Sequence, residues 1–162
     1  MESITYQPHN KEYFSKLLSF AKELLEVCGK LKIKPIVYGS LAYAFYTKDE
    51  TINIHDLDFL VPESSFVKLI NKIKVSKKLH YEETDYNSLK VFKDEVKITF
   101  DAIEKYYNDL PNDFINVEIN SIPFTIVKLN SLKEVYNRGK NTIPTKREQY
   151  SKKLKQLNKM IH

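Results

Sequence analysis

A short apolar segment with two aspartates at alternate positions, Asn53 to Val61, most constrains how this chain can fold. In a strand, Asp56 and Asp58 point to one side, about 7 Å apart, and Leu57 and Phe59 point to the other side, into the core. Two carboxylates on one face repel each other unless a cation neutralises them. Hard oxygen ligands of this kind suit Mg²⁺ or Mn²⁺. The pattern therefore indicates either a divalent-metal site or an ordinary acidic pair at an exposed strand end.

A second apolar run, Ile36 to Tyr38, ends in Gly39-Ser40, and a helix is expected over Leu41 to Tyr46. A helix N-terminus offers free N–H groups and a partial positive charge to a phosphate. Gly39 allows close backbone approach, and the Ser40 hydroxyl adds a donor. The Walker and Rossmann glycine patterns are absent, so any phosphate-facing helix start is short. A simple helix cap is the alternative interpretation of the same two residues.

A third carboxylate, Asp101, lies in a strand expected over Val96 to Ile103, on the polar face that also carries Lys97 and Thr99. If this strand lies beside the Asp56–Asp58 strand, three carboxylates converge. Three carboxylates can hold two metal ions about 3.5–4 Å apart, one on a triphosphate and one on an acceptor hydroxyl. Asp101 can also serve as a general base. The alternative is that Asp101 is an ordinary residue of a half-exposed strand.

The remaining pattern places helices at both ends of the chain and a mixed sheet between them. Helices are expected over Lys11 to Cys28, Phe66 to Ile73, Ser131 to Arg138 and Lys146 to Met160, with Asn10 as the first N-cap and with Gly29 and Gly139 as stops. Further strands are expected over His80 to Thr84, Leu89 to Phe92, Ile115 to Ile119 and Ile122 to Val127, with turns at Lys93–Glu95 and Asn120-Ser121 and a polar stretch from Tyr106 to Asp113. The 162 residues show no repeat or linker, which predicts one α+β domain spanning residues 1–162.

Composition narrows the setting of this domain. The formal net charge is +5, and much of the excess lies near the C-terminus. A solvated helix face accounts for this charge, and a surface for triphosphate or RNA is the sharper alternative. No apolar run long enough to span a membrane and no signal-peptide pattern is visible. The single cysteine, Cys28, cannot form an internal disulfide, which favours a reducing compartment and hence the cytoplasm.

Gly39-Ser40, the acidic pair Asp56 and Asp58, and the distal Asp101 together resemble the nucleotidyltransferase superfamily related to DNA polymerase β. The chain is most similar to small single-domain bacterial members, which include lincosamide- and aminoglycoside-type antibiotic nucleotidyltransferases and minimal nucleotidyltransferases of toxin–antitoxin pairs. The resemblance implies a nucleotidyltransferase-like mixed β-sheet with flanking helices. It also implies that Gly39 and Ser40 bind the triphosphate and that the three aspartates are catalytic and hold the metals.

The implied reaction is metal-dependent transfer of a nucleoside monophosphate, with AMP the first choice, from ATP or another NTP to a hydroxyl, releasing pyrophosphate. The resemblance leaves the acceptor open among a small molecule such as an antibiotic, a protein side chain and an RNA end. It also implies that a homodimer or a partner subunit can complete the acceptor site. The alternative function is a non-catalytic member that acts as a binding or antitoxin-like partner, against which the intact Asp56, Asp58 and Asp101 argue.

Overall fold

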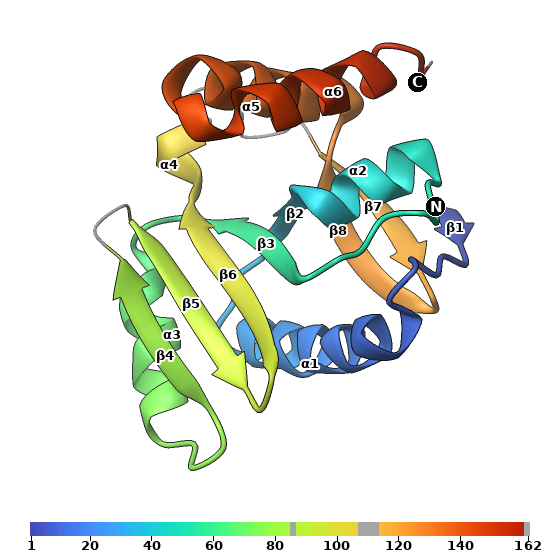
Figure 1. Ribbon diagram of the computed structural model, residues 1–162. Coiled ribbons are helices and arrows are strands. Elements are labelled where there is room, and N and C mark those ends of the chain that lie inside the picture. The colour runs from blue at the N-terminus through green and yellow to red at the C-terminus, as the bar shows by residue number, and fades with distance from the viewer. Residues whose placement is uncertain (85–86, 107–113, 161–162) are drawn as a thin grey trace.

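The computed structural model describes residues 1–84, 87–106 and 114–160, and these form an α+β fold around one mixed sheet (Figure 1). The eight strands follow the order β1-β7-β8-β2-β3-β6-β5-β4. They are β1 (Glu2–Ile4), β2 (Ile36–Tyr38), β3 (Asp56–Val61), β4 (His80–Thr84), β5 (Ser88–Lys93), β6 (Val96–Ala102), β7 (Phe114–Ile119) and β8 (Ile122–Val127). The helices are α1 (Lys11–Lys30), α2 (Ser40–Thr47), α3 (Ser65–Lys74), α4 (Ile103–Tyr106), α5 (Leu129–Thr142) and α6 (Arg147–Leu157), with the 3₁₀ turn η1 (Pro144–Lys146) between the last two.

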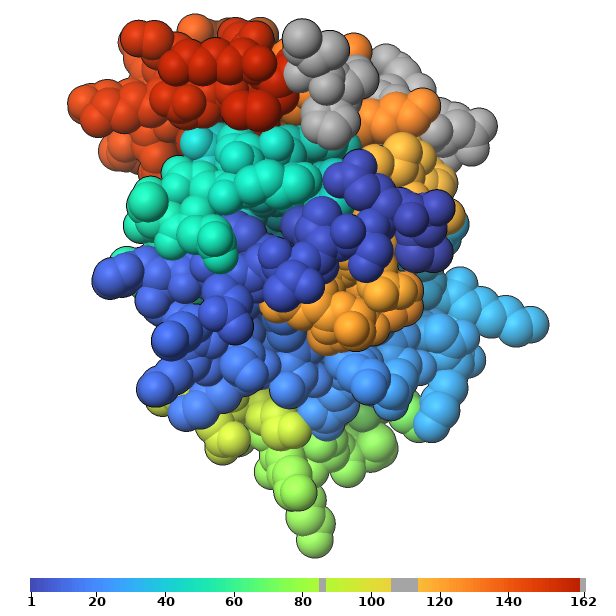
Figure 2. Space-filling model, turned by 90° about the vertical axis from the view of Figure 1, so that its right-hand side faces the viewer, coloured from blue at the N-terminus to red at the C-terminus, as the bar shows by residue number. Residues whose placement is uncertain are grey.

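The helices lie in layers about the sheet. In the view of Figure 1, α1 lies below the sheet against β3 and β6, and α5 and α6 lie above it. Helix α2 lies between the sheet and the C-terminal pair, because it contacts β2 and β3 on one side and α5 and α6 on the other. Figure 2 shows the same stacking from the side, with the C-terminal residues at one end of the molecule directly above α2.

The centre of the sheet brings the two sequence motifs together. Strand β2 pairs antiparallel with β3, with Tyr38 opposite Asp58. Strand β3 pairs parallel with β6, with Asp58 opposite Thr99. Because residues opposite each other on neighbouring strands share a face, the predicted placement of the two acidic strands side by side is confirmed.

Two predicted hairpin turns are also confirmed. Asn120 and Ser121 both have positive φ, 50° and 67°, as a two-residue type I′ turn between antiparallel β7 and β8 requires. Asp94, at φ 52°, lies in the turn between β5 and β6. The predicted polar stretch from Tyr106 to Asp113 lies outside the described residues apart from Tyr106, which ends α4.

Three predicted helix signals were wrong. The Asn10 side chain does not cap α1, because its amide instead donates to the Ile54 carbonyl at 2.8 Å and accepts from the Ile54 N–H at 3.0 Å. Gly29 lies within α1, and the positive φ that follows the helix belongs to Lys32, at 58°. Gly139 lies inside α5, where it gives the Tyr150 ring of α6 room for close approach.

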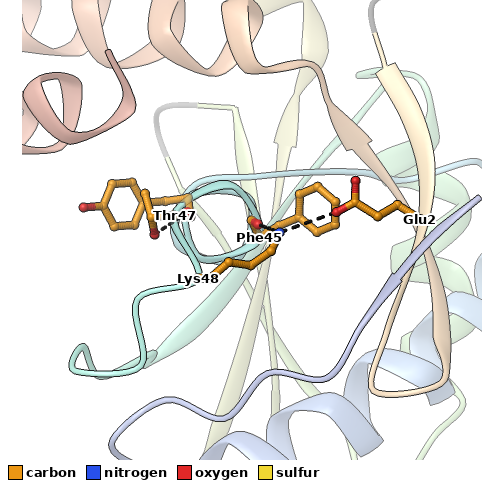
Figure 3. A network of polar contacts seen from close by, with 5 residues as sticks. Glu2, Phe45, Thr47 and Lys48 are labelled. Carbon is orange, nitrogen blue, oxygen red and sulfur yellow. Dashed lines mark hydrogen bonds and ion pairs between the residues drawn. The ribbon is translucent and has the colours of Figure 1, made fainter. Parts of the chain in front are cut away.

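The far end of α2 is fixed by a small polar network (Figure 3). Lys48, at φ 58°, ends the helix and donates its Nζ to the Phe45 carbonyl. The same Nζ lies 3.5 Å from the Glu2 carboxylate of β1, and the Thr47 hydroxyl donates back into the helix. An exposed pair such as Lys48–Glu2 contributes about 0–1 kcal/mol. The network therefore positions the C-terminal end of α2 against the sequence-distant N-terminal strand, while its other end faces the candidate site.

Candidate functional site

Asp56 and Asp58 lie on one face of β3, at the centre of the sheet. Asp56 lies opposite Lys97 of β6, and the Lys97 Nζ lies 3.5 Å from the Asp56 carboxylate. Their side chains are 27% and 33% exposed, so this pair is reachable from solvent. The ion pair compensates part of the charge on Asp56, and a ligand can still approach its free edge.

Asp58 is electrostatically the more perturbed carboxylate. Burial raises its pKa well above the usual value, and the neighbouring charges of Asp56 and Asp101 raise it further. Lys97 and Lys146 act in the opposite direction without cancelling these effects. The ionised Asp58 would therefore be stabilised by one more cation close to its carboxylate.

Gly39 lies directly against Asp58. Its φ of 72° and ψ of −145° form a conformation that is essentially restricted to glycine. A Cβ at this position would lie 2.7 Å from the Asp58 Oδ2. The missing side chain and the positive φ are thus both required where β2 passes into α2.

Ser40 is the first residue of α2 and is partly exposed. No side-chain capping bond closes this helix start, and the first intrahelical bond runs from the Tyr43 N–H to the Gly39 carbonyl at 2.9 Å. The leading N–H groups of α2 therefore lie next to the acidic pair, since Gly39 contacts Asp58.

Asp101 shares the acidic face but is held differently from the other two aspartates. It is 5% exposed, and its two carboxylate oxygens accept hydrogen bonds from the hydroxyls of Tyr38 and Ser88. It lies opposite Leu60, two residues beyond the level of Asp58, which puts the Asp58 and Asp101 Cα atoms about 8 Å apart by strand geometry. Within residues 1–84, 87–106 and 114–160, no three acidic, His or Cys side chains gather closely enough to hold one metal ion.

Lys153 of α6 belongs to this site, although its sequence context indicated only a basic helix. Its Nζ lies 5.4 Å from the centre of the Tyr43 ring and 5.3 Å from that of Tyr136. Burial lowers the pKa of its ammonium group, and the charge of Asp58 acts against this shift. The spacing of Tyr150, Lys153 and Leu157 at i, i+3 and i+7 was the available signal, since it puts Lys153 on the inward stripe of α6.

The donor set fits a divalent cation. Asp56 and Asp58 present oxygen ligands on one accessible face, and the raised pKa of Asp58 reflects negative charge that a cation would relieve. The basic Lys146 and Lys153 act electrostatically on the same carboxylate from α6 and the turn before it. The arrangement can therefore hold a metal together with a polyanion between the sheet, α2 and α6.

Solved structures with the same fold are nucleotidyltransferases. The antibiotic-resistance factor ANT(2'')-Ia is similar over 90% of this chain and 83% of its own, with a TM-score of 0.65 and 11% identity. The lincosamide antibiotic adenylyltransferase LnuA, solved with lincomycin bound, is similar over 94% of this chain and 98% of its own, with a TM-score of 0.54 and 11% identity. A putative nucleotidyltransferase from Thermotoga maritima has a TM-score of 0.53 and 17% identity over 81% of this chain and 91% of its own.

These likenesses show that the chain has the nucleotidyltransferase fold, as its motifs predicted. No family model and no curated protein sequence matches the chain. No helix in the described part of the chain is both long and apolar enough to cross a bilayer.

Proposed function

We propose that this chain, which has the nucleotidyltransferase fold, transfers a nucleoside monophosphate from an NTP to a hydroxyl group and releases pyrophosphate. The observation that carries this proposal is the contact of Gly39 with Asp58, beside Asp56 on the central strand. This contact joins a helix start suited to phosphate and a carboxylate pair suited to a cation at one point of the sheet.

Asp56 and Asp58 would hold Mg²⁺ or Mn²⁺. When bound, such a metal neutralises charge on the phosphates and favours deprotonation of an attacking hydroxyl. The N–H groups at the start of α2 and the Ser40 hydroxyl would hold phosphate oxygens of the NTP. Lys146 and Lys153 would stabilise the negative charge that develops on pyrophosphate as it leaves.

Asp101 is proposed as the third carboxylate of the site. It would accept the proton of the acceptor hydroxyl or add a ligand for a second metal. For either role at least one of its oxygens must exchange a hydroxyl donor, Tyr38 or Ser88, for the new partner. These two hydroxyls thus fix where the Asp101 carboxylate waits on the sheet.

ATP is the first NTP to test. One solved structure of ANT(2'')-Ia contains adenylyl-2''-tobramycin, and LnuA is named an adenylyltransferase. These names support AMP as the transferred group and a small-molecule hydroxyl as one class of acceptor. An RNA end and a protein side chain remain the other two classes.

The test is incubation with ATP labelled at the α-phosphate, Mg²⁺ and one acceptor from each class: tobramycin, lincomycin, RNA and the protein itself. Label should move to one class of acceptor, with release of pyrophosphate. Asp58→Asn should abolish transfer while circular dichroism shows an unchanged fold. Asp94→Asn is the matched control, because Asp94 lies in an exposed hairpin turn whose positive φ asparagine tolerates. Full activity of Asp58→Asn would contradict the proposed metal site.

A further inference from the structure

A groove of about 600 Å³ lies between α5 and α6, and its lining is basic and polar. Its cationic side chains are Lys133, Lys140 and Lys155. Amide side chains alternate with them, and Leu154 is the one aliphatic residue in the lining. Figure 1 shows the two helices side by side at the end of the molecule farthest from α1.

The charge of this helix pair sets it apart from the rest of the chain. Residues 128–160 carry ten Lys and Arg residues against two Glu, whereas acidic residues outnumber basic ones in the remainder. The two Glu are already paired: Glu134 accepts from Arg138 at 2.9 Å, and Glu148 lies 3.4 Å from Lys152. Because Glu134 is the acid that lines the groove, its pairing leaves the three groove lysines as uncompensated charge.

Spacing along α5 makes these groups a regular row. Asn130, Lys133, Asn137 and Lys140 recur at i, i+3, i+7 and i+10, a stripe about 15 Å long. Lys133 and Lys140 are half-buried, so their charges are recessed between the helices rather than extended into solvent. In the part of the chain that the structure describes, none of the three groove lysines forms an ion pair.

We propose that this groove binds the phosphate backbone of a single-stranded nucleic acid. A row of ammonium and amide donors matches a repeating anion, and a recessed row suits a narrow strand better than a duplex. The lining contains no aromatic side chain on which bases could stack, so we expect little base preference. An acidic protein partner would ordinarily add apolar anchor residues, and the groove offers only Leu154.

The position of the groove connects it to the transfer reaction. The same helix pair carries Lys153 on its inner side, where the charge of Asp58 reaches it. A strand held in the groove would therefore be held on the element that borders the candidate site. Naming the strand as the hydroxyl acceptor rests on the proposed function, whereas its binding does not.

Fluorescence anisotropy tests the binding with a labelled 16-nucleotide RNA of mixed sequence, without NTP or metal, over a series of salt concentrations. The triple variant Lys133→Gln, Lys140→Gln and Lys155→Gln should bind about tenfold or more weakly at low salt, with a log–log salt slope smaller by about 2, because each lost phosphate contact removes about 0.7. The matched control changes Lys68, Lys72 and Lys74 to Gln, an equal change of charge on exposed positions of α3, and should keep wild-type affinity.

Further arms make the result decisive. A DNA of the same sequence separates a backbone contact, which predicts similar affinities, from one that also uses the 2′-hydroxyl, which predicts tighter RNA binding. The Lys→Arg version of the groove triple should restore binding, which guards against misfolding as the cause of the loss. Asp58→Asn should bind RNA like wild type, so a failure of transfer and a failure of the groove are distinguishable. Equal loss in both Gln triples, or equally tight binding of poly-glutamate, would overturn the proposal.

Discussion

Gly39 shows at the scale of one residue how the candidate site depends on a missing side chain. Its φ of 72° and the 2.7 Å separation between a built Cβ and the Asp58 Oδ2 are independent obstacles to substitution. We predict that Gly39→Ala destabilises the fold by about 1–3 kcal/mol from the backbone alone. Because the added methyl also displaces Asp58, nucleotide binding should fall further than stability does.

Urea denaturation and nucleotide titration of Gly39→Ala measure the two effects separately. Gly29→Ala is the control, because Gly29 lies in α1 with nothing within 4 Å of a built Cβ and has no positive φ. It should stabilise the protein by about 0.5–1 kcal/mol and leave binding unchanged. Wild-type nucleotide affinity in Gly39→Ala would contradict the role given to this contact.

Cys28 gives a prediction that concerns the core rather than the site. Burial raises the pKa of its thiol to about 12, and its side chain is fully enclosed. A thiol reagent at pH 8 should therefore modify the folded protein only at the rate of unfolding, and the urea-unfolded protein at once. Since the folded pKa is raised, the stability contributed by the protonated thiol is complete below the unfolded pKa of about 8.5 and is lost as pH rises toward 12. Rapid modification of the folded chain would contradict the burial of this residue.

Some site residues could be found from the sequence and others could not. Gly39, Asp56 and Asp58 stand in short apolar runs whose period-two pattern fixes which side chains share a face. The hydroxyl partners of Asp101, Tyr38 and Ser88, could not be found, because their contacts depend on which strands are neighbours. Local pattern carries orientation within a strand but no information on the strand beside it.

At the scale of elements, the helices and strands were largely predictable and their ends were not. Strand β1 was missed because it has only three residues and no apolar alternation, and it forms by parallel pairing with β7. Gly139 was read as a helix stop because glycine commonly ends helices. Its actual role is tertiary: a Cβ there would lie 2.5 Å from the Tyr150 Cε2.

This contact predicts how the C-terminal helices respond to mutation. Gly139→Ala should destabilise the protein by about 1–2 kcal/mol, because overpacking of α5 against α6 outweighs the better helix propensity of alanine. In a Tyr150→Ala background the same change should become stabilising, since the clash is gone. Thermal unfolding of the four variants in this double-mutant cycle measures the coupling. Additive effects would show that α5 and α6 do not meet at this point.

At the scale of the whole molecule, the strand order could not be predicted from single-strand patterns. Strand β2 lies between β8 and β3, and β3 lies between β2 and β6, so each central neighbour comes from a distant or reversed segment. The motifs nevertheless predicted the nucleotidyltransferase fold, because that fold requires a glycine-led helix start and an acidic strand to meet. Lys153 stayed hidden for the same long-range reason, since α6 reaches the site only through its packing on α2.

The most direct measurement of the central claim is calorimetric titration of ATP into the protein with and without Mg²⁺. The account predicts binding that requires Mg²⁺, that is lost in Asp58→Asn, and that is weakened in Lys153→Gln by about tenfold, as expected for loss of one charge-assisted contact. Asp94→Asn should bind like wild type. No binding of any NTP, or binding that persists without metal and in Asp58→Asn, would contradict a metal-dependent nucleotide site at Gly39, Asp56 and Asp58.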